Sequence, residues 1–489
     1  MQHFLARLIL SLCLLFCLNA CNSSIDKTAN DSDAIGPPNI IYILADDLGY
    51  GDLSCYGQTL FSTPNIDQLA AAGMRFTQHY SGSTVCAPSR SALMTGQHTG
   101  HTFIRGNQEV RPEGQYPIPD NSYTLAEALK KSGYATGAFG KWGLGYPGSE
   151  GDPNNQGFDT FFGYNCQRIG HHYYPYHLWS NQDSIILKEN AGKQKGAYAP
   201  ELIHQEALSF IRKNKENPFF LYLPSVIPHA ELIAPDSVMN KYLGKFEPEL
   251  DYKGYDDGPR YRKGPYESQA NSHAAFVAMI EILDRQVGEI VQTLEELGLS
   301  DNTLIIFTSD NGPHKEGGAD PEYFNSNGPL KGFKRDLYEG GIRVPMIAKW
   351  PKTITAGTSS DHISAFWDVF PTLAELTNME APENIDGISF LPTLKGTVEA
   401  QEKHDYLYWE FHERGGRLAI RKGNWKAVKY NVLKDPNASI ELYDLSKDLG
   451  EDNNIAADHP EVVAEMQVIL DEARTPTEVF PFVSKVKID

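Results

Sequence analysis

Two apolar segments, residues 39–45 and 303–309, constrain the fold of this 489-residue chain more than any other feature. Each is a continuous run of apolar and β-branched residues, which is typical of a strand buried on both faces of a mostly parallel sheet. Amphipathic helical patterns lie between them, and the clearest covers residues 272–297. This alternation predicts an α/β fold in which helices sandwich a large, mostly parallel sheet. Further predicted elements are helices at 124–131 and 204–213 and strands at 136–139 and 219–223.

The pattern changes near residue 400. Short apolar segments separated by tight turns follow one another over residues 405–445, and an amphipathic pattern that opens with a proline covers residues 460–474. Strands in quick succession together with one helix predict a small antiparallel α+β subdomain. We therefore expect a large domain over residues 38–400 and a C-terminal subdomain over residues 401–489.

The first 37 residues have the pattern of an export signal followed by a tether. Residues 1–20 contain one early arginine and an apolar stretch that is too short to span a bilayer, as in a signal peptide. The residues before Cys21 resemble a bacterial lipoprotein box, so we expect lipid on Cys21; ordinary cleavage without a lipid is the alternative. Residues 21–37 are polar and suit a tether. The sequence thus predicts an exported protein that is held in the bacterial envelope, at the outer membrane or the periplasmic face, by an N-terminal lipid.

The net charge argues against one class of function. A formal net charge of −20 argues against nonspecific nucleic-acid binding, because phosphate backbones bind cationic surfaces. An anionic substrate stays compatible with this charge, since cations can be concentrated locally.

Cys55 and Cys166 lie outside the signal and outside any motif. We favour two free thiols there, and a single disulfide is the alternative.

Carboxylates follow both apolar strands, where a ligand site is expected. Asp46 and Asp47 come directly after the first strand, and Asp310 and Asn311 follow the second. Ligands of open α/β sheets bind beyond the carboxyl ends of the strands. Adjacent buried carboxylates are costly unless a cation joins them, and these oxygen donors suit Ca²⁺ better than Zn²⁺, with Mg²⁺ as an alternative. If the two strands are neighbours, the sequence predicts a Ca²⁺ site; a solvated turn is the alternative for the first pair.

The segment around Cys86 has the pattern of a reactive residue at a helix start. Pro88 favours the first helical turn, which places Cys86 at or just before a helix N-terminus. Such a position favours anions and a lowered thiol pKa, and Arg90 adds a permanent cation one turn on. These residues predict a nucleophile beside an anion-binding site. A buried structural cysteine is the alternative.

The sequence from Cys86 to Arg90 is similar to the Cys-x-Pro-Ser-Arg signature of the formylglycine-dependent sulfatases, a family of the alkaline phosphatase superfamily. The resemblance covers about residues 38–475 and includes the small C-terminal subdomain. It implies that a formylglycine-generating maturation enzyme oxidises Cys86 to 3-oxoalanine (formylglycine). It also implies a Ca²⁺ site made by residue 86 with Asp46, Asp47, Asp310 and Asn311.

The same resemblance implies the other catalytic residues. Arg90, Lys141 and Lys334 would stabilise the charge of the sulfate group, and His229 would donate a proton to the leaving alcohol. Lys141 lies in a Gly-Lys-Trp segment. Lys334 precedes a Glu-Gly-Gly segment by the family's spacing, which favours it over Lys331.

One residue departs from the family pattern. The chain reads Gly-Lys-Trp-Gly-Leu-Gly, with Gly143 where the family usually has a histidine that helps the formylglycine hydrate lose its second proton. We expect a nearby histidine to act in its place, and a glycan-binding protein without turnover is the alternative. The candidate histidines are His101, His171, His172 and His314.

The implied substrate is a sulfated sugar of a polysaccharide or its oligosaccharides, as for polysaccharide sulfatases of marine or gut bacteria. The Gly143 variant, with residues 100–107 and 311–314, resembles sulfatases for 4-sulfated galactose or N-acetylgalactosamine, so carrageenan-type and chondroitin-type chains are both candidates. A phosphonate or phosphodiester hydrolase of the same superfamily is the alternative reaction. We expect residues 236–270 to border the substrate cleft. Residues 168–177 suit sugar stacking and hydroxyl contacts, and a packed surface loop is the alternative for them. Predicted substrate contacts are Arg105, His171, His172 and His314.

Overall fold

The computed structural model describes residues 36–435 and 437–482, so the predicted signal peptide, Cys21 and most of the tether lie outside the described residues. Residues 37–435 and 437–482 form one compact unit. No helix in the described ranges is both long enough and apolar enough to cross a membrane.

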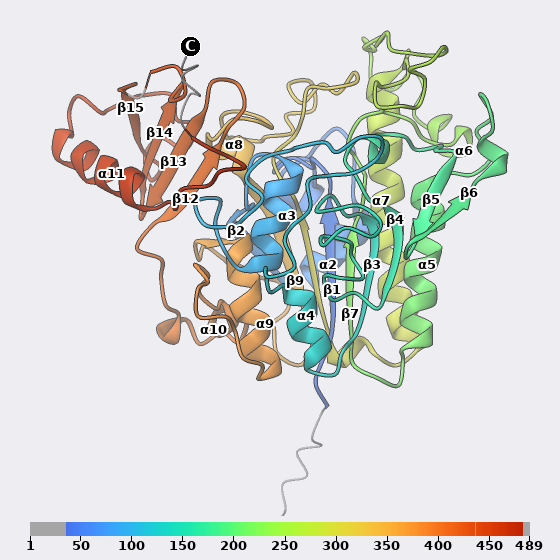
Figure 1. The fold of residues 1–489 in the computed structure, drawn as a ribbon, viewed down its shortest axis with the longest axis horizontal. Helices are drawn as coiled ribbons and strands as arrows, with labels where there is room; N and C mark the ends of the chain where they lie inside the picture. Colours follow the sequence, from blue (N-terminus) through green and yellow to red (C-terminus); the bar gives the residue numbers. More distant parts are fainter. Residues whose placement is uncertain (1–35, 436, 483–489) are drawn as a thin grey trace, which may run out of the picture. The chain divides into compact units, whose positions relative to one another are not determined.

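An eleven-stranded sheet forms the centre of the large α/β body (Figure 1). Its strands are β1 (Asn39–Ala45), β2 (Met74–Tyr80), β3 (Ala135–Lys141), β4 (Thr160–Tyr164), β5 (His177–Ser180), β6 (Asp183–Ile186), β7 (Phe219–Pro224), β8 (Thr303–Ser309), β9 (Arg343–Lys349), β10 (Thr358–Ser360) and β11 (Ser364–Ala365). Their order is β10-β2-β9-β8-β1-β7-β3-β4-β5-β6, and β11 pairs with β2 outside this path.

The two strands that anchor the sequence prediction are neighbours. β1 and β8 pair in parallel, with Ala45 opposite Ser309. β7 pairs in parallel with both β1 and β3. The central strands β8, β1, β7 and β3 therefore run in one direction, while β9, β5 and β6 make antiparallel pairs nearer the edges. The predicted α/β class with a mostly parallel sheet is confirmed.

Helices cover both faces of the sheet, because alternate residues of a strand point to opposite sides. Ile41 and Ile43 of β1 face one core, which includes the helices α2 (Pro64–Ala71), α5 (Ala199–Lys213) and α7 (Ser272–Glu296). Ile40, Tyr42 and Leu44 face the other, which includes α3 (Cys86–Thr95), α4 (Leu125–Lys131), α9 (Val369–Thr377) and α10 (Leu391–Leu394). Short helices are α6 (Asp236–Met239) and α8 (Glu339–Ile342), and 3₁₀ turns lie at Ser54–Tyr56, Ile169–His171, Lys188–Asn190, Ser300–Asn302, Phe366–Asp368 and Val398–Ala400.

The predicted helices form, with one shifted boundary. The helix expected from residue 204 begins at Ala199, because Pro200 suits the first helical turn and extends the pattern upstream. Thr124 caps α4 through a capping box with Glu127. Cys55 and Cys166 are free thiols, as the sequence analysis favours.

A four-stranded antiparallel sheet forms the predicted C-terminal part, with its strands in sequence order (Figure 1). Its elements are β12 (Leu407–Phe411), β13 (Arg417–Lys422), β14 (Trp425–Tyr430), β15 (Ile440–Asp444) and α11 (Pro460–Glu472). Ile420 and Met466 belong to a core between this sheet and α11. Trp409 on the opposite face packs with Tyr80 and Trp367 of the large body. The domain division at residue 400 stays a prediction.

Candidate active site

The predicted site residues follow the four central parallel strands. Since the carboxyl ends of parallel neighbours meet at one edge of a sheet, side chains placed there converge. β1 is followed by Asp46 and Asp47, β8 by Asp310 and Asn311, and β7 by the segment that holds His229, while β3 ends at Lys141.

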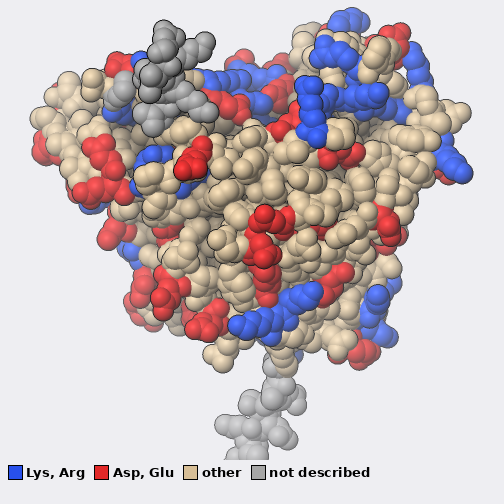
Figure 2. Space-filling view, in the orientation of Figure 1, with Lys and Arg blue, Asp and Glu red and all other residues tan. Residues whose placement is uncertain are grey.

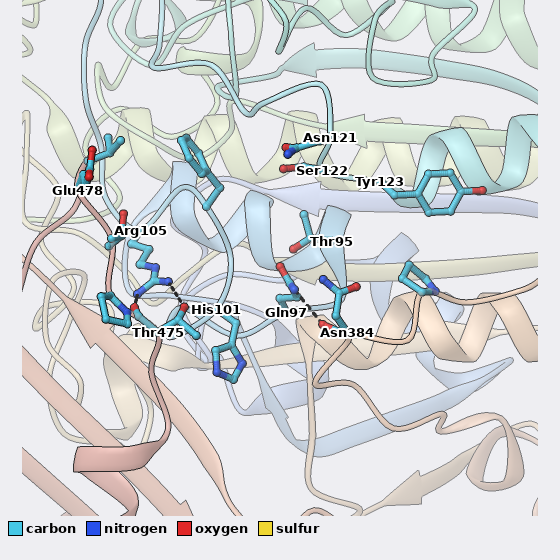
Figure 3. Close-up of a pocket in the computed structure, with 15 residues that line it drawn as sticks. Thr95, Gln97, His101, Arg105, Asn121, Ser122, Tyr123, Asn384, Thr475 and Glu478 are labelled. Atoms are coloured by element: carbon cyan, nitrogen blue, oxygen red, sulfur yellow. Dashed lines mark hydrogen bonds between the residues drawn. The ribbon is translucent and has the colours of Figure 1, made fainter.

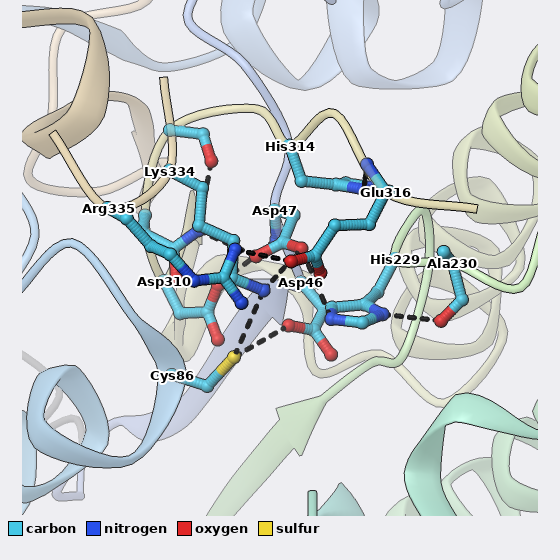
Figure 4. Close-up of polar contacts among 12 residues, drawn as sticks. Asp46, Asp47, Cys86, His229, Ala230, Asp310, His314, Glu316, Lys334 and Arg335 are labelled. Carbon is cyan, nitrogen blue, oxygen red and sulfur yellow. Dashed lines mark hydrogen bonds and ion pairs between the residues drawn. The ribbon is translucent and has the colours of Figure 1, made fainter. Parts of the chain in front are cut away.

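Cys86 is the first residue of α3, and it lies among charged groups from other elements (Figure 4). Its Sγ is 3.4 Å from Oδ1 of Asp46. The ammonium groups of Lys141 and Lys334 lie 3.5 and 3.9 Å from the same sulfur. Pro88 falls in the first turn, as predicted. The atom at position 86 therefore lies beside one carboxylate and two ammonium groups.

The predicted lowering of the Cys86 thiol pKa is wrong. Burial raises the pKa, and the opposing effect of Lys141 and Lys334 does not overcome it. Cys86 is 2% exposed, so the thiolate would lose nearly all its hydration. The site is thus not built to hold an unmodified thiolate nucleophile.

Each buried carboxylate at the site pairs with a cation from a distant part of the chain. Lys141 Nζ lies 2.5 Å from Oδ2 of Asp46, and Lys334 Nζ lies 2.8 Å from Oδ2 of Asp47. Nη2 of Arg90 lies 2.9 Å from Oδ2 of Asp310. Burying unpaired charges would be costly, so these pairs hold the strand ends and α3 in one arrangement.

The carboxyl groups differ in how well their charge is compensated. Burial would raise the pKa of Asp46, but Lys141 and Arg90 outweigh it and hold the pKa at about 2. Burial and the Asp46 charge instead raise the pKa of Asp310 to about 7, although Arg90 opposes them. The neighbouring cations thus compensate the negative charge of these carboxylates only in part, so a further cation would stabilise them.

The donor groups fit a cation with oxygen ligands. Ligand atoms of Asp46, Asp47, Cys86 and His229 all lie within 4.8 Å of one another. Asn311 donates from Nδ2 to Asp47 at 2.6 Å, while its buried Oδ1 has no hydrogen-bond partner among the described residues. A buried carbonyl oxygen without a donor, beside two carboxylates, is a suitable ligand for a hard cation.

His229 lies at the centre of three stacked imidazole rings. Its Nε2 is 3.3 Å from Oδ2 of Asp47. The ring centres of His171 and His314 lie 4.6 and 5.2 Å from that of His229. Burial, with the charges of Lys334 and Lys141, lowers the pKa of His229 well below its usual range. The neutral ring can hydrogen-bond with a substrate oxygen.

The predicted substrate histidines divide into two groups. His171 lies beside His229, and none of the described residues hydrogen-bonds with its ring nitrogens. His172 is instead structural, because its Nδ1 lies 3.2 Å from Glu231 and its Nε2 accepts from the Gly264 amide. Both nitrogens of His314 also have partners, the Glu316 amide and the Pro228 carbonyl.

Two further predicted residues lie elsewhere. His101 lies in a pocket of about 570 Å³ beside Thr95, at the C-terminal end of α3, with Nδ1 2.8 Å from Asp386 (Figure 3). A ten-residue helix is about 15 Å long, so His101 cannot replace a base near Cys86. Arg105 donates to Glu410 and Thr475 and ties the C-terminal part to the α/β body.

Sequence reasoning missed two amide side chains beside Gly143. Gly143 has φ +83°, and a Cβ there would overlap Nε2 of Gln167. The amide groups of Gln167 and Asn165 are buried, and neither has a hydrogen-bond partner in the described part of the chain. No motif marks these residues; the parallel pairing of β3 with β4, which continues from Gly143 N–H to the Asn165 carbonyl, brings them to the site.

The loop predicted to border the cleft does so in part. The ring of Tyr266 lies 5.3 Å from that of His171 and 6.2 Å from that of His229. Lys331, the lysine that the sequence analysis rejected, donates to the Glu451 carbonyl and lies over the ring of Tyr338. The geometry therefore agrees with the choice of Lys334.

Comparisons with known proteins identify the family. A family model described as Sulfatase matches residues 38–379, and one described as N-sulphoglucosamine sulphohydrolase, C-terminal, matches residues 332–475. N-acetylgalactosamine-6-O-sulfatase of Bacteroides thetaiotaomicron is 32% identical over 540 residues, covering 94% of this chain and 97% of the relative. Arylsulfatase A of Homo sapiens is 34% identical over 473 residues, covering 87% of this chain and 86% of the relative.

A crystal structure of Ps i-CgsB in complex with k-i-k-neocarrahexaose is similar in fold, with a TM-score of 0.74 and 29% identity over 89% of this chain and 92% of that one. The region matched by the Sulfatase model contains all four strands whose ends carry the site. Since the relatives also align with nearly the whole chain, this protein belongs to the sulfatase family and is a sulfuric ester hydrolase.

Proposed function

We propose that this sulfatase removes sulfate from a galactose or N-acetylgalactosamine residue of a polysaccharide or its oligosaccharides, and that it uses a formylglycine at position 86 and a Ca²⁺ ion. The observation that carries this proposal is the surrounding of Cys86 Sγ by Asp46, Lys141 and Lys334. The raised thiol pKa argues against a thiolate nucleophile, and a hydrated aldehyde needs no thiolate.

Formylglycine and Ca²⁺ would supply a nucleophile and positive charge. Residue 86, once converted, would supply a hydroxyl nucleophile, and Ca²⁺ held by residue 86 with Asp46, Asp47, Asp310 and Asn311 would supply charge to the sulfate oxygens.

The chain's own cations then position the ester. Lys141 and Lys334 neutralise sulfate oxygens, because their ammonium groups lie 3.5 and 3.9 Å from Cys86 Sγ. Arg90 bonds Asp310 and is fully buried, as Lys141 is, and it adds its charge to that of the two lysines. We assign Nε2 of His229 as the proton donor to the sugar oxygen as the sulfur–oxygen bond breaks; the negative charge of a bound sulfate would raise the pKa of the ring, so that both of its nitrogens carry protons.

His171 is our choice for the base that replaces the histidine missing at Gly143. It lies against His229, and its ring nitrogens have no hydrogen-bond partner within the described residues. Burial and the charge of Lys141 lower the pKa of His171 well below its usual range, so the free ring is neutral. The negative charge of a bound sulfate would raise this pKa and make the ring a better proton acceptor.

The substrate class rests on the relatives. The Bacteroides thetaiotaomicron relative is named for N-acetylgalactosamine 6-sulfate, and the Ps i-CgsB structure contains a neocarrahexaose. Both are galactose-type sugars, which supports this class. Our sequence-based preference for the 4-sulfate stays a proposal, with the 6-sulfate as its direct competitor.

Sulfate release by the matured protein tests the proposal. The substrates are 4-sulfated and 6-sulfated galactose and N-acetylgalactosamine, with a phosphodiester and a phosphonate ester of the same sugar as the test of the phosphonate or phosphodiester hydrolase alternative. We expect release from one sulfated sugar that Cys86→Ala abolishes, and faster turnover of the sulfate ester than of the phosphodiester or the phosphonate ester. Binding of the sugars without release, in protein whose formylglycine is verified by peptide mass, would instead favour a glycan-binding protein without turnover.

We also propose export, lipid attachment at Cys21 and conversion of Cys86 by a formylglycine-generating enzyme. The amino-terminal pattern supports the first two, and the Cys-Ala-Pro-Ser-Arg sequence supports the third. Mass spectrometry of the N-terminal and Cys86 peptides from the producing bacterium measures all three. An unmodified cysteine at position 21 would contradict the lipid anchor.

A further inference from the structure

A second pocket adjoins the active site. It has a volume of about 600 Å³, which lies in the range of small-ligand pockets. Its apolar surface comes from rings and prolines that include Tyr176 and Tyr261, and its cations are Arg168, Arg262 and Lys263. It opens to solvent at Tyr176, which is 52% exposed, and at Lys263.

Two chain segments connect this pocket with the site around Cys86. Arg168 lines the pocket, and His171, three residues on, stacks on His229. Lys263 also lines the pocket, and Tyr266, three residues on, lies against His171. Three residues span at most about 10 Å of chain, so a short oligosaccharide can occupy both places.

The two segments are held firmly to each other. The Gly264 amide donates to Nε2 of His172 at 2.9 Å, and Nε of Arg168 donates to the Lys263 carbonyl at 2.6 Å. Arg262 donates to Glu267 and to the carbonyls of Asn190 and Gln194. The pocket wall is therefore preformed, which lowers the entropic cost of binding.

The charges in the pocket leave one cation uncompensated. Arg168 pairs with Glu109, Arg262 with Glu267, and the pocket's carboxylate, Glu113, with His177. Within residues 36–435 and 437–482, no carboxylate lies within ion-pair distance of the Lys263 ammonium group. Figure 2 shows Lys and Arg side chains gathered at the upper right of the molecule, above the region of α6, despite the net charge of −20. An anionic group is the complement of this pocket.

We propose that this pocket is a subsite for a second, anionic sugar residue, next to the residue that loses its sulfate. Tyr176 offers an exposed ring to the apolar face of the sugar, and Lys263 binds its sulfate or carboxylate. The enzyme then favours oligosaccharides over monosaccharides. This inference rests on the proposed function, because it takes a sulfated sugar as the occupant of the site around Cys86.

Equilibrium binding tests the subsite separately from catalysis. The protein is expressed without the maturation enzyme, so that residue 86 stays a cysteine, and is titrated calorimetrically with hexasaccharides of carrageenan and of chondroitin sulfate. We expect Tyr176→Ala and Lys263→Ala each to weaken binding of one hexasaccharide about tenfold, the scale of one aromatic or charge-assisted contact. The matched controls are Tyr255→Ala, which removes a ring that is 42% exposed, and Lys253→Ala. Both residues lie outside the pocket lining, so these two variants should bind the hexasaccharide as tightly as the parent protein does.

Kinetics of the matured protein complete the test. Tyr176→Ala and Lys263→Ala should raise KM for the hexasaccharide about tenfold and leave kcat/KM for the sulfated monosaccharide within about twofold. Equal losses on both substrates, unchanged hexasaccharide affinity in both variants, or no binding of either hexasaccharide would overturn the subsite. Absence of sulfate release from every monosaccharide would overturn the proposed function instead, and the calorimetric result would still decide the subsite.

Discussion

The amide of Gln167 occupies the space into which a side chain at Gly143 would project. Gly143 has φ +83°, a conformation that favours glycine, and its amide donates to the carbonyl of Asn165. A buried amide side chain therefore fills the space beside position 143, so a larger residue there would have to displace it.

Gly143→Ala should lower the free energy of unfolding by more than a glycine substitution that causes backbone strain and no overlap. Gly133 is the matched control, because it has φ +88° and nothing within 4 Å of its Cβ position. We expect about 1 kcal/mol for Gly133→Ala and about 2–3 kcal/mol for Gly143→Ala, since the new methyl group must also displace Gln167. Denaturant unfolding measures both. In a Gln167→Ala background the two costs should become equal; a difference that persists there would refute the role of the overlap.

Gln167→Leu should separate activity from stability. The Gln167 amide is buried without a partner among the described residues, so leucine of similar size should leave the free energy of unfolding unchanged or increase it. If the substrate supplies the missing hydrogen bonds, kcat/KM should fall about tenfold. Unfolding curves and sulfate release by the matured variant measure the two effects. Full activity in Gln167→Leu would show that the amide does not act on substrate.

The central sheet and the carboxylate cluster could be predicted because they depend on short, continuous patterns. The apolar runs before Asp46 and Asp310 are local signals, and the parallel pairing of β1 with β8 brings the carboxylates together. Cys86 and Lys141 stood in recognisable motifs. Each of these predictions needed only a segment and the general geometry of a parallel sheet.

The remaining site residues depend on contacts between distant segments, which no local pattern encodes. His101 and His171 are equally plausible in the sequence, yet one lies at the far end of α3 and the other against His229. The thiol pKa of Cys86 was predicted in the wrong direction, because helix position and nearby cations are visible in a motif but the extent of burial is not.

Lys334→Ala should greatly reduce sulfatase activity. Lys334 Nζ lies 3.9 Å from Cys86 Sγ and 2.8 Å from Asp47, so its loss removes charge stabilisation at the sulfate. We expect kcat/KM to fall by about 10²–10³-fold. Lys331→Ala, which removes a lysine bound to the Glu451 carbonyl, is the control and should retain activity within a few-fold. Comparable losses in both variants would contradict the assignment.

Calcium should stabilise the folded protein. A cation at Asp46, Asp47 and Asn311 would relieve repulsion between buried carboxylates and bind the free Oδ1 of Asn311. At a hundredfold excess over Kd, binding adds about 2.7 kcal/mol to the free energy of unfolding. Tm measured after chelation and during titration with Ca²⁺ or Mg²⁺ reports this effect, and Asn311→Ala should weaken the response to Ca²⁺. A Tm that neither ion changes would contradict the site.

The ion pair between His404 and Asp368 should make stability depend on pH. Nε2 of His404 lies 2.8 Å from Oδ1 of Asp368. Burial would lower the pKa of His404, but the Asp368 carboxylate outweighs it and raises the pKa above the usual 6.5. The folded protein therefore binds the proton more tightly than the unfolded chain. The contribution of the ion pair to the free energy of unfolding is complete below pH 6.5 and is lost as the pH rises through the raised pKa of His404.

His404→Gln isolates this contribution from the other titrating groups. The free energy of unfolding of the parent minus that of the variant should decrease as the pH rises from about 6 to about 9. Among the surrounding ionisable groups, Asp386 and Asp405 also favour the protonated ring, so moderate salt should reduce the decrease without abolishing it. Parallel stability curves for the parent and His404→Gln across this range would mean that the His404 pKa is the same in the folded and unfolded chain, which the contact with a fully buried Asp368 carboxylate argues against.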